Sequence, residues 1–304
     1  MVMMLSDPPV PADWARHTPT SDPGRFATLL DGVDPDHAEI GPVVRTLLAH
    51  YRAQAEDLPA TSRHDVDLRW VEEMLAVDQQ RHPGLALSAH REIGERLQGC
   101  CRDHTLLAVS ILRHHGVPAR SRVGFADYFL TDWHSDHVVV EMHDGNRWRR
   151  VDTEVEQGSG LLPDPLDLET GPGAPFLSAA EAFRALRAGT LDAASYGVAP
   201  GHPLSGEDFV LSEVFWELAH RYGDETLLWD GWGAIPAPGE TMGEELLTVL
   251  DEVVEHLIAA DAGDMAAERG LYEQYLRDPR LSPGTAVLQF SPVGDGPVKV
   301  VLRS

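Results

Sequence analysis

The stretch Gly99–Arg120, GCCRDHTLLAVSILRHHGVPAR, constrains the fold of this chain more than any other. Apolar residues recur with a period near 3.6 between Leu106 and Leu112, which predicts a largely buried helix that begins just after two adjacent cysteines. We expect this helix to end at Gly116, because glycine favours the backbone conformation that follows a helix and Val117-Pro118 cannot continue it.

The two cysteines therefore fall on the first turn of the helix. Unpaired N–H groups and the positive end of the helix dipole favour a thiolate there. Cys101 is thus a candidate nucleophile. We interpret Cys100 as a packing residue, because only one of two neighbours on a first turn can face a given partner. A redox partnership between Cys100 and Cys101 is the alternative.

After Pro118 the apolar period changes to two, and we expect three strands, at 119–125, 137–143 and 146–152. Asp144-Gly145 is typical of a two-residue type I′ hairpin turn. In that register His143 pairs with Asn146, and His137 lies directly across from Asp152, with Cβ atoms about 4.5–5.5 Å apart. An imidazole and a carboxylate so placed are expected to form a hydrogen bond, which completes a set of nucleophile, base and orienting group.

The rest of the chain is predicted to be mainly helical. Helical patterns cover 25–58, with a break near 32–42, then 65–77 and a short 92–97. A Gly/Pro-rich loop at 156–175 precedes helices at 179–188, 209–222, 242–260 and 266–277 and a closing pair of strands within 285–302. Ser178 is expected to cap the helix that follows it. Helices, then strands, then more helices predict an α+β fold rather than a parallel α/β sheet.

Several of these segments together resemble the transglutaminase-like superfamily of cysteine enzymes. They are Gly99-Cys100-Cys101-Arg102-Asp103, the run LLAVSILRHHGVPARSRVGFADYF, Asp136-His137 with Glu141, and Trp148-Arg149-Arg150-Val151-Asp152. The resemblance covers about residues 93–155, and TLLWDGWG at 226–233 more weakly resembles the C-terminal half of a bacterial subfamily. The sequence departs from the family at Val138, where an aromatic is usual, and at Thr153-Glu154.

The resemblance implies a papain-like α+β core, in which the helix bearing the cysteine packs on an antiparallel sheet. It implies Cys101 as nucleophile, His137 as general base and acid, and Asp152 as the orienting carboxylate. We accordingly divide the chain into an irregular and helical lead-in (1–60), a transglutaminase-like catalytic core (61–160) and a mostly helical C-terminal region with a short closing β-hairpin (161–304).

The expected activity is cysteine-dependent acyl transfer through a thioester acyl-enzyme. The substrate would be a small-molecule, peptide or protein-bound amide, ester or thioester. Water as second nucleophile makes the protein a peptidase or amidase, and an amine makes it an amide-forming transferase. The alternatives are a non-catalytic binding or scaffold protein on this fold and a thiol redox sensor.

The charge of the chain excludes two classes of partner. It has 24 Lys and Arg against 49 Asp and Glu, a net charge of −25, so nucleic acid and anionic membrane surfaces are poor partners. The excess of negative charge instead favours a cationic or amine-bearing substrate. Lys299 is the only lysine in the sequence, so a Schiff-base mechanism would have a single candidate residue.

The sequence predicts a cytoplasmic protein. No window reaches the roughly 18 apolar residues of a membrane span, and the start, MVMMLSDPPVPADW, lacks the basic region and apolar run of an export signal. The two cysteines are adjacent, so no disulfide framework is expected. No cofactor is expected, and the oligomeric state is left open.

Some residues keep more than one interpretation. His134 and His137, with His143 nearby, suggest a metal site, but the first two point to opposite faces of a strand and no zinc-type spacing is present, so no metal is predicted. The group Trp229, Asp230 and Trp232 either lines a substrate cleft or pins the C-terminal helices onto the core. An oxyanion hole needs a donor besides the N–H of Cys101, and Gln98 and Trp70 are the candidates.

Overall fold

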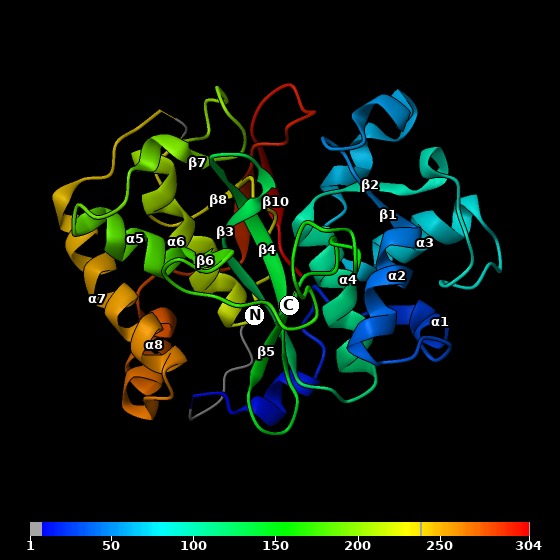
Figure 1. Cartoon of the computed structure of the whole chain (residues 1–304), viewed down its shortest axis with the longest axis horizontal. Coiled ribbons are helices and arrows are strands. Elements are labelled where there is room, and N and C mark those ends of the chain that lie inside the picture. The colour runs from blue at the N-terminus through cyan, green and yellow to red at the C-terminus, as the bar shows by residue number, and fades with distance from the viewer. Residues whose placement is uncertain (1–7, 238, 304) are drawn as a thin grey trace.

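The structure is a computed structural model that describes residues 8–237 and 239–303. An antiparallel sheet runs through its middle, with the N-terminal helices on one side and the C-terminal helices on the other (Figure 1). The helices are α1 (Ala27–Leu30), α2 (His37–Leu47), α3 (Val71–Arg81), α4 (Cys101–His114), α5 (Ala179–Arg187), α6 (Glu207–Arg221), α7 (Glu244–Asp261) and α8 (Met265–Arg277). The strands are β1 (Leu48–His50), β2 (Leu97–Gly99), β3 (Ala119–Leu130), β4 (Trp133–His143), β5 (Trp148–Val151), β6 (Phe176–Ser178), β7 (Tyr196–Gly197), β8 (Asp230–Gly231), β9 (Ala286–Gln289) and β10 (Val298–Val301).

Helix α4 begins at the second of the two cysteines, one residue earlier than predicted, and ends at His114, two residues before Gly116. A capping box fixes its start, because Oδ2 of Asp103 accepts the backbone N–H of Cys100 at 2.8 Å. After its last turn Gly116 has a φ of 77°, a conformation that glycine adopts without a Cβ clash. Every residue from Cys101 to Arg113 is buried, so the helix is enclosed by the rest of the molecule.

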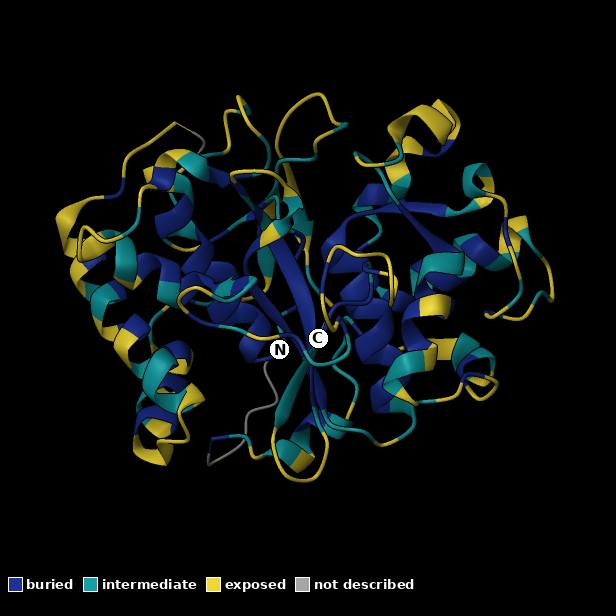
Figure 2. Cartoon of the chain, viewed as in Figure 1, coloured by how far each residue is buried: buried dark blue, intermediate teal, exposed yellow. Residues whose placement is uncertain are grey.

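The largest sheet has the order β5-β4-β3-β6, with β7 added in parallel to β4. Its other pairings are antiparallel, and helices with antiparallel sheets make the fold α+β, as predicted. Strand β6 comes from the C-terminal region, so residues well beyond the hairpin complete this sheet. Figure 2 shows buried residues concentrated along the sheet and along the helices beside it.

The turn between β4 and β5 differs from the prediction. His143 pairs with Trp148 rather than Asn146, so each partner on β5 lies two positions further along than predicted. A type I′ turn needs a positive φ at both central residues, and of Asp144-Gly145 only the glycine has one, at 96°. Oδ1 of Asp144 instead accepts the N–H groups of Asn146 at 2.9 Å and Arg147 at 3.0 Å, which closes a longer loop.

Most other predicted elements are present, with shifted ends. The helical pattern predicted over 25–58 is wrong after Leu47, where β1 begins, and the short helix predicted at 92–97 is only a 3₁₀ turn, Ile93–Glu95, followed by β2. Ser178 caps α5, and β9 and β10 form the closing antiparallel pair. Helix α2 begins at His37, inside the predicted break, because Asp36 caps its first turn. The parallel pair of β1 with β2 was not predicted, and it places His50 beside Gly99 at the start of α4.

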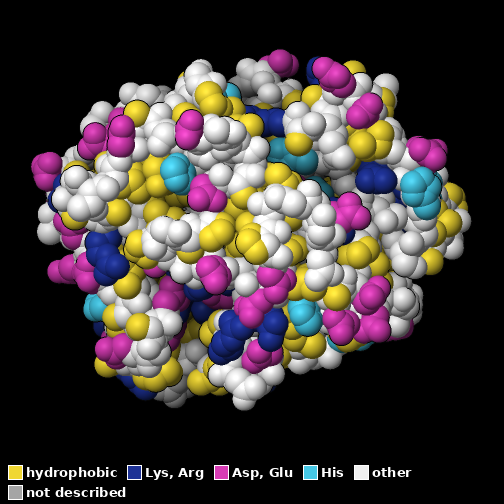
Figure 3. Space-filling view, in the orientation of Figure 1, with side chains coloured by type: hydrophobic (Ala, Val, Ile, Leu, Met, Phe, Trp, Pro, Cys, Tyr) yellow, Lys and Arg dark blue, Asp and Glu magenta, His cyan; other side chains and the backbone are white. Residues whose placement is uncertain are grey.

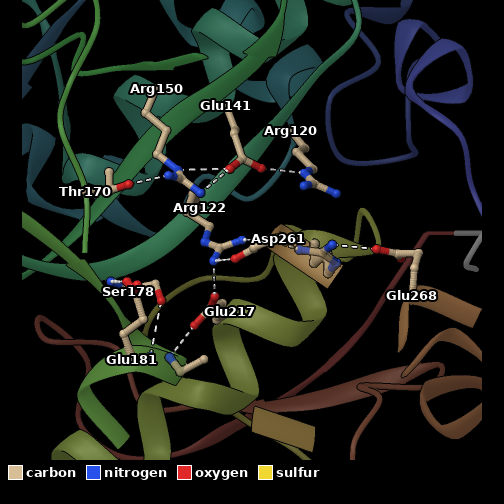
Figure 4. A network of polar contacts seen from close by, with 12 residues as sticks. Arg120, Arg122, Glu141, Arg150, Thr170, Ser178, Glu181, Glu217, Asp261 and Glu268 are labelled. Atoms are coloured by element: carbon tan, nitrogen blue, oxygen red, sulfur yellow. Dashed lines mark hydrogen bonds and ion pairs between the residues drawn. The ribbon is translucent and has the colours of Figure 1, made fainter. Parts of the chain in front are cut away.

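A buried ion network fastens the C-terminal helices to the sheet (Figure 4). Arg122 on β3 lies 2.8 Å from Glu217 of α6 and also binds Asp261 at the end of α7. Asp261 lies 2.7 Å from Arg221, which reaches Glu268 of α8 at 2.5 Å. These contacts fix α6, α7 and α8 relative to β3.

Candidate active site

The two predicted residues of the hairpin meet in a buried contact. Nε2 of His137 lies 2.9 Å from Oδ2 of Asp152, and each residue is 2% exposed. The hydroxyl of Tyr128 donates to the same oxygen at 2.5 Å, and the N–H of Glu154 donates to Oδ1 at 2.9 Å. Burial alone raises the pKa of Asp152, but the charge of His137 and these hydrogen bonds lower it, so the carboxylate is favoured.

This contact forms although the predicted register is wrong. In the observed register Asp152, which follows β5, is diagonal to His137 across the hairpin rather than directly opposite. A shift of two residues leaves each side chain on its predicted face, because side-chain direction alternates along a strand. Diagonal neighbours remain within reach of long side chains such as the imidazole.

Carboxylates and aromatic rings surround His137. Burial alone lowers the pKa of His137, but the charge and hydrogen bond of Asp152, together with the charges of Glu154 and Asp136, raise it overall. The ring of Phe129 packs edge-on, with centroids 4.9 Å apart and planes at 70°. The imidazole is therefore held in one orientation and favoured in its protonated form.

Cys101 is the first residue of α4, and its surroundings in the folded protein oppose ionisation of its thiol. It is 4% exposed, and among the described residues its side-chain hydrogen bond goes to Cys100, with none seen to His137. That bond raises the pKa of Cys101 well above its usual range, and burial and the charges of Glu154 and Asp136 raise it further. These effects oppose the thiolate that the start of the helix is expected to favour.

The start of α4 nevertheless packs onto β4 beside His137. Thr105, one turn after Cys101, donates its hydroxyl to the carbonyl of the residue after His137 at 2.8 Å. Nδ1 of His104 lies 3.2 Å from Oε1 of Glu154, and the other oxygen of Glu154 lies 3.7 Å from Nδ1 of His137. The cysteine-bearing end of the helix and the hairpin thus belong to one polar cluster.

Glu154 and His104 are the members of this cluster that the sequence analysis missed. The signal was present for both. Glu154 lies two residues after Asp152, so in an extended chain the two side chains are expected to point to the same face. His104 lies four residues after Cys100 and therefore shares its helix face.

Aromatic residues lie next to the cysteines. Tyr51, just after β1, donates its N–H to the carbonyl of Gly99 at 2.9 Å and accepts Nε–H of Arg52 on its hydroxyl at 2.7 Å. Trp229 packs edge-on against Tyr51, with ring centroids 6.3 Å apart. Of the three residues in the 229–232 group, Trp229 is thus the one that contacts the surroundings of the site.

Of the other two, Asp230 attaches the C-terminal region to the segment before α3, and Trp232 makes a contact within the C-terminal region. Asp230 is buried, binds Arg69 through both oxygens and accepts the N–H of Leu227 at 2.8 Å. Trp232 is buried and donates Nε1–H to the carbonyl of Leu281 at 3.1 Å. Both therefore fit the structural interpretation.

Gln98 is bound away from the thiol. Its amide donates to the carbonyl of Pro59 at 2.8 Å and to the hydroxyl of Ser62 at 2.9 Å, which uses both of its N–H groups. Trp70 lies under the guanidinium of Arg303, which is 4.4 Å from its ring centroid. The N–H of Cys101 remains a donor, because first-turn N–H groups have no partner within the helix.

The histidines of β4 that suggested a metal site are engaged with aromatic rings. His134 stacks on Tyr196 with centroids 4.1 Å apart, and His143 packs edge-on against Trp148. In residues 8–237 and 239–303, no group of three or more His, Cys, Asp or Glu side chains is arranged to hold a metal ion. Across the same residues, no helix combines the length and the apolar character needed to traverse a bilayer.

The surface in Figure 3 carries acidic side chains over both halves of the molecule, and basic side chains gather at its lower centre, over the β4–β5 hairpin. These arginines already have acidic partners. Arg147 binds Asp167, and Arg149 lies 3.2 Å from Asp144. Each of these two arginines therefore has a carboxylate beside it.

Comparison with known proteins gives one kind of match. Residues 68–153 match the family model of the transglutaminase-like superfamily core. Members of this superfamily generally carry out cysteine-dependent acyl transfer or hydrolysis, and the matched segment contains Cys101, His137 and Asp152. No curated protein and no solved structure matched the chain.

Proposed function

We propose that this protein is a cysteine-dependent acyl-transfer enzyme with a papain-like core, in which Cys101 is the nucleophile, His137 the general base and acid, and Asp152 the orienting carboxylate. The buried contact of 2.9 Å between Nε2 of His137 and Asp152 carries the proposal. It leaves Nδ1 as the ring nitrogen that can exchange a proton with a thiol. The superfamily match, which spans all three residues, supports the same roles.

In the proposed reaction the Cys101 thiol gives its proton to Nδ1 of His137, and the sulfur attacks the carbonyl carbon of an amide, ester or thioester. The backbone N–H of Cys101 donates to the resulting oxyanion. His137 then protonates the leaving group, and a thioester acyl-enzyme remains. The second nucleophile gives its proton to His137 as it attacks this thioester, and Cys101 leaves as a thiolate that takes the proton back.

The second nucleophile decides the class of enzyme. Water makes the protein a peptidase or amidase, and an amine makes it an amide-forming transferase. The acyl donor is a small molecule, a peptide or a protein-bound group. A net charge of −25 raises the local concentration of cations, which favours a protonated amine among the candidate acceptors.

Thiol redox sensing is the second candidate, because Cys100 and Cys101 are adjacent free cysteines and both are buried. It predicts a reversible oxidation at these sulfurs that does not depend on His137. A disulfide between adjacent residues is strained, which makes this candidate weaker than triad chemistry.

Alkylation by iodoacetamide, with the modified residue located by mass spectrometry, tests the proposal. We expect Cys101 to react, and His137→Ala to slow its reaction at least about tenfold. Cys100→Ser is the matched control and should keep the reactivity of Cys101. Reaction at Cys100 alone, or a Cys101 rate that His137→Ala leaves unchanged, would exclude the triad.

Product analysis then separates hydrolysis from transfer. The enzyme is incubated with an activated ester, a thioester and an amide, each with and without a primary amine. A new amide product identifies a transferase, and the free acid alone identifies a hydrolase. Cys101→Ser should abolish either product, and product that persists in this variant would contradict a thioester intermediate.

A further inference from the structure

The two ring nitrogens of His137 face two different carboxylates. Oδ2 of Asp152 lies 2.9 Å from Nε2, and Oε2 of Glu154 lies 3.7 Å from Nδ1. With Nε2 occupied, Nδ1 is the nitrogen left for the proton of Cys101. Glu154 therefore competes with the thiol for the nitrogen that the proposed reaction uses.

Glu154 is itself held from the opposite side. Its Oε1 lies 3.2 Å from Nδ1 of His104, and the same ring nitrogen lies 2.9 Å from the carbonyl oxygen of Cys100. The side chain of Glu154 is 12% exposed, so solvent screens its charge only partly. Glu154 thus bridges His104 of α4 and His137 of β4, and His104 in turn contacts the carbonyl of Cys100.

The charged and titratable groups around this bridge come from five parts of the chain. They are His50 of β1, Cys101 and His104 of α4, Tyr128 of β3, Asp136 and His137 of β4, and Asp152 after β5. Within this set, the negative charge of Glu154 raises the pKa of Cys101 and the pKa of His137 together. Both effects favour a neutral thiol beside a protonated imidazole, which is not the reactive ion pair.

We infer that Glu154 is a positioning residue that holds the site at rest, with His104 as its anchor, by occupying the Nδ1 side of His137 until a substrate displaces it. The inference rests on the proposed function and deepens it, because it names the group that regulates the same site. When Glu154 leaves, Nδ1 faces Cys101 and the carboxylate no longer opposes the thiolate. The site thereby lowers the reactivity of its nucleophile until it is occupied.

The test compares the pH dependence of iodoacetamide alkylation at Cys101 in the full-length wild type, Glu154→Gln and His104→Gln. Glutamine keeps the length and polarity of Glu154 but removes its charge. We expect Glu154→Gln to react about tenfold faster at pH 7, with its profile displaced to lower pH by about one unit. His104→Gln, which releases the anchor, should displace the profile in the same direction by less.

Glu156→Gln is the matched control, because Glu156 is an exposed carboxylate two residues further along, and its profile should equal that of the wild type. Circular dichroism confirms that each variant is folded, and His104→Gln decides the test if Glu154→Gln does not fold. An unchanged or alkaline-displaced profile in the folded variants overturns the role of Glu154. Loss of the His137 dependence of the Cys101 rate would instead overturn the proposed function, so the two failures are distinguishable.

Discussion

Asp152 binds Nε2 of His137 from a position diagonal to it across the β4–β5 hairpin, at 2.9 Å. Tyr128 donates to the same carboxylate oxygen, so Oδ2 of Asp152 accepts two hydrogen bonds in a buried site. A charged acceptor shared in this way fixes the tautomer of His137, with the proton on Nε2 and Nδ1 directed elsewhere.

Replacing Asp152 by Asn should lower the proposed activity by about 10²- to 10⁴-fold. The amide retains the shape of the carboxylate but neither stabilises the imidazolium nor selects the Nε2–H tautomer. Turnover of an activated ester or thioester, measured at saturating substrate, checks this expectation. Asp164→Asn, at an exposed site in the loop after the hairpin, is the control and should retain full activity. Equal turnover in the two variants would remove Asp152 from the mechanism.

The same pair makes stability depend on pH. The raised pKa of His137 contributes stability that is complete below its unfolded value of about 6.5 and is lost as pH rises through the folded pKa. The lowered pKa of Asp152 contributes stability that is present above about 3.9 and is lost as pH falls through the folded pKa. Asp152→Asn should therefore lower the free energy of unfolding most near pH 5.5, by about 3 kcal/mol.

Urea unfolding at pH 5.5 and pH 9 measures this difference. The cost of Asp152→Asn should be smaller at pH 9, above the folded pKa of His137, where a neutral imidazole faces the carboxylate. A cost that is equal at both pH values would show that His137 is neutral in the folded protein throughout.

The sequence determines the local parts of this site. The period of the apolar residues and the glycine at 116 predict both ends of α4, and alternation predicts that His137 and Asp152 share a face. The register itself was not predictable from the Asp144-Gly145 pair, because the side chain of Asp144 closes a different loop through hydrogen bonds with two backbone N–H groups.

Contacts between residues far apart in the sequence explain the other differences between the predictions and the structure. The pKa of Cys101 is raised mainly by the adjacent Cys100 and by burial, and further by the charges of Glu154 and Asp136. Burial and these two distant carboxylates depend on the tertiary fold, and the helix-end argument contains no information about them. Arg122 and Asp261 are 139 residues apart in sequence, so nothing local indicates that they meet. The division of the chain into three segments stays a prediction, although β6 from the third segment pairs with β3 of the second.

His220 should make the protein less stable in mild acid. It is fully buried on α6, where its Nδ1 accepts the hydroxyl of Ser121 at 2.8 Å and its Nε2 faces the carbonyl of Thr226 at 3.1 Å. Burial lowers the pKa of His220 to about 3, so the unfolded chain binds a proton below about pH 6.5 that the folded protein does not. Stability is complete above about pH 6.5 and falls as pH decreases toward 3.

Between pH 7.5 and pH 5 this residue should remove about 2 kcal/mol from the free energy of unfolding. His220→Gln loses hydrogen bonds at every pH but has no titrating group, so its urea midpoints should change less over this interval. A variant with the same pH slope as the wild type would assign the acid sensitivity to other groups.

Asp261 should be the most sensitive point of the network that attaches α7 to the sheet (Figure 4). Its carboxylate binds Arg122 and Arg221, whose side chains are each 3% exposed. Asp261→Asn leaves both buried guanidinium groups short of charge compensation, which should cost about 2–3 kcal/mol, less than in a fully buried pair because the side chain of Asp261 is itself 19% exposed. Thermal unfolding, followed by circular dichroism, measures the loss.

Asp251→Asn is the matched control on the same helix. Asp251 pairs with Arg187 at 3.0 Å, and the two side chains are 44% and 37% exposed. An exposed pair of this kind contributes less than about 1 kcal/mol, because water and salt screen it. The melting temperature should therefore fall by many degrees for Asp261→Asn and hardly at all for Asp251→Asn. Similar melting temperatures for the two variants would mean that apolar packing, and not the ion network, holds α7 in place.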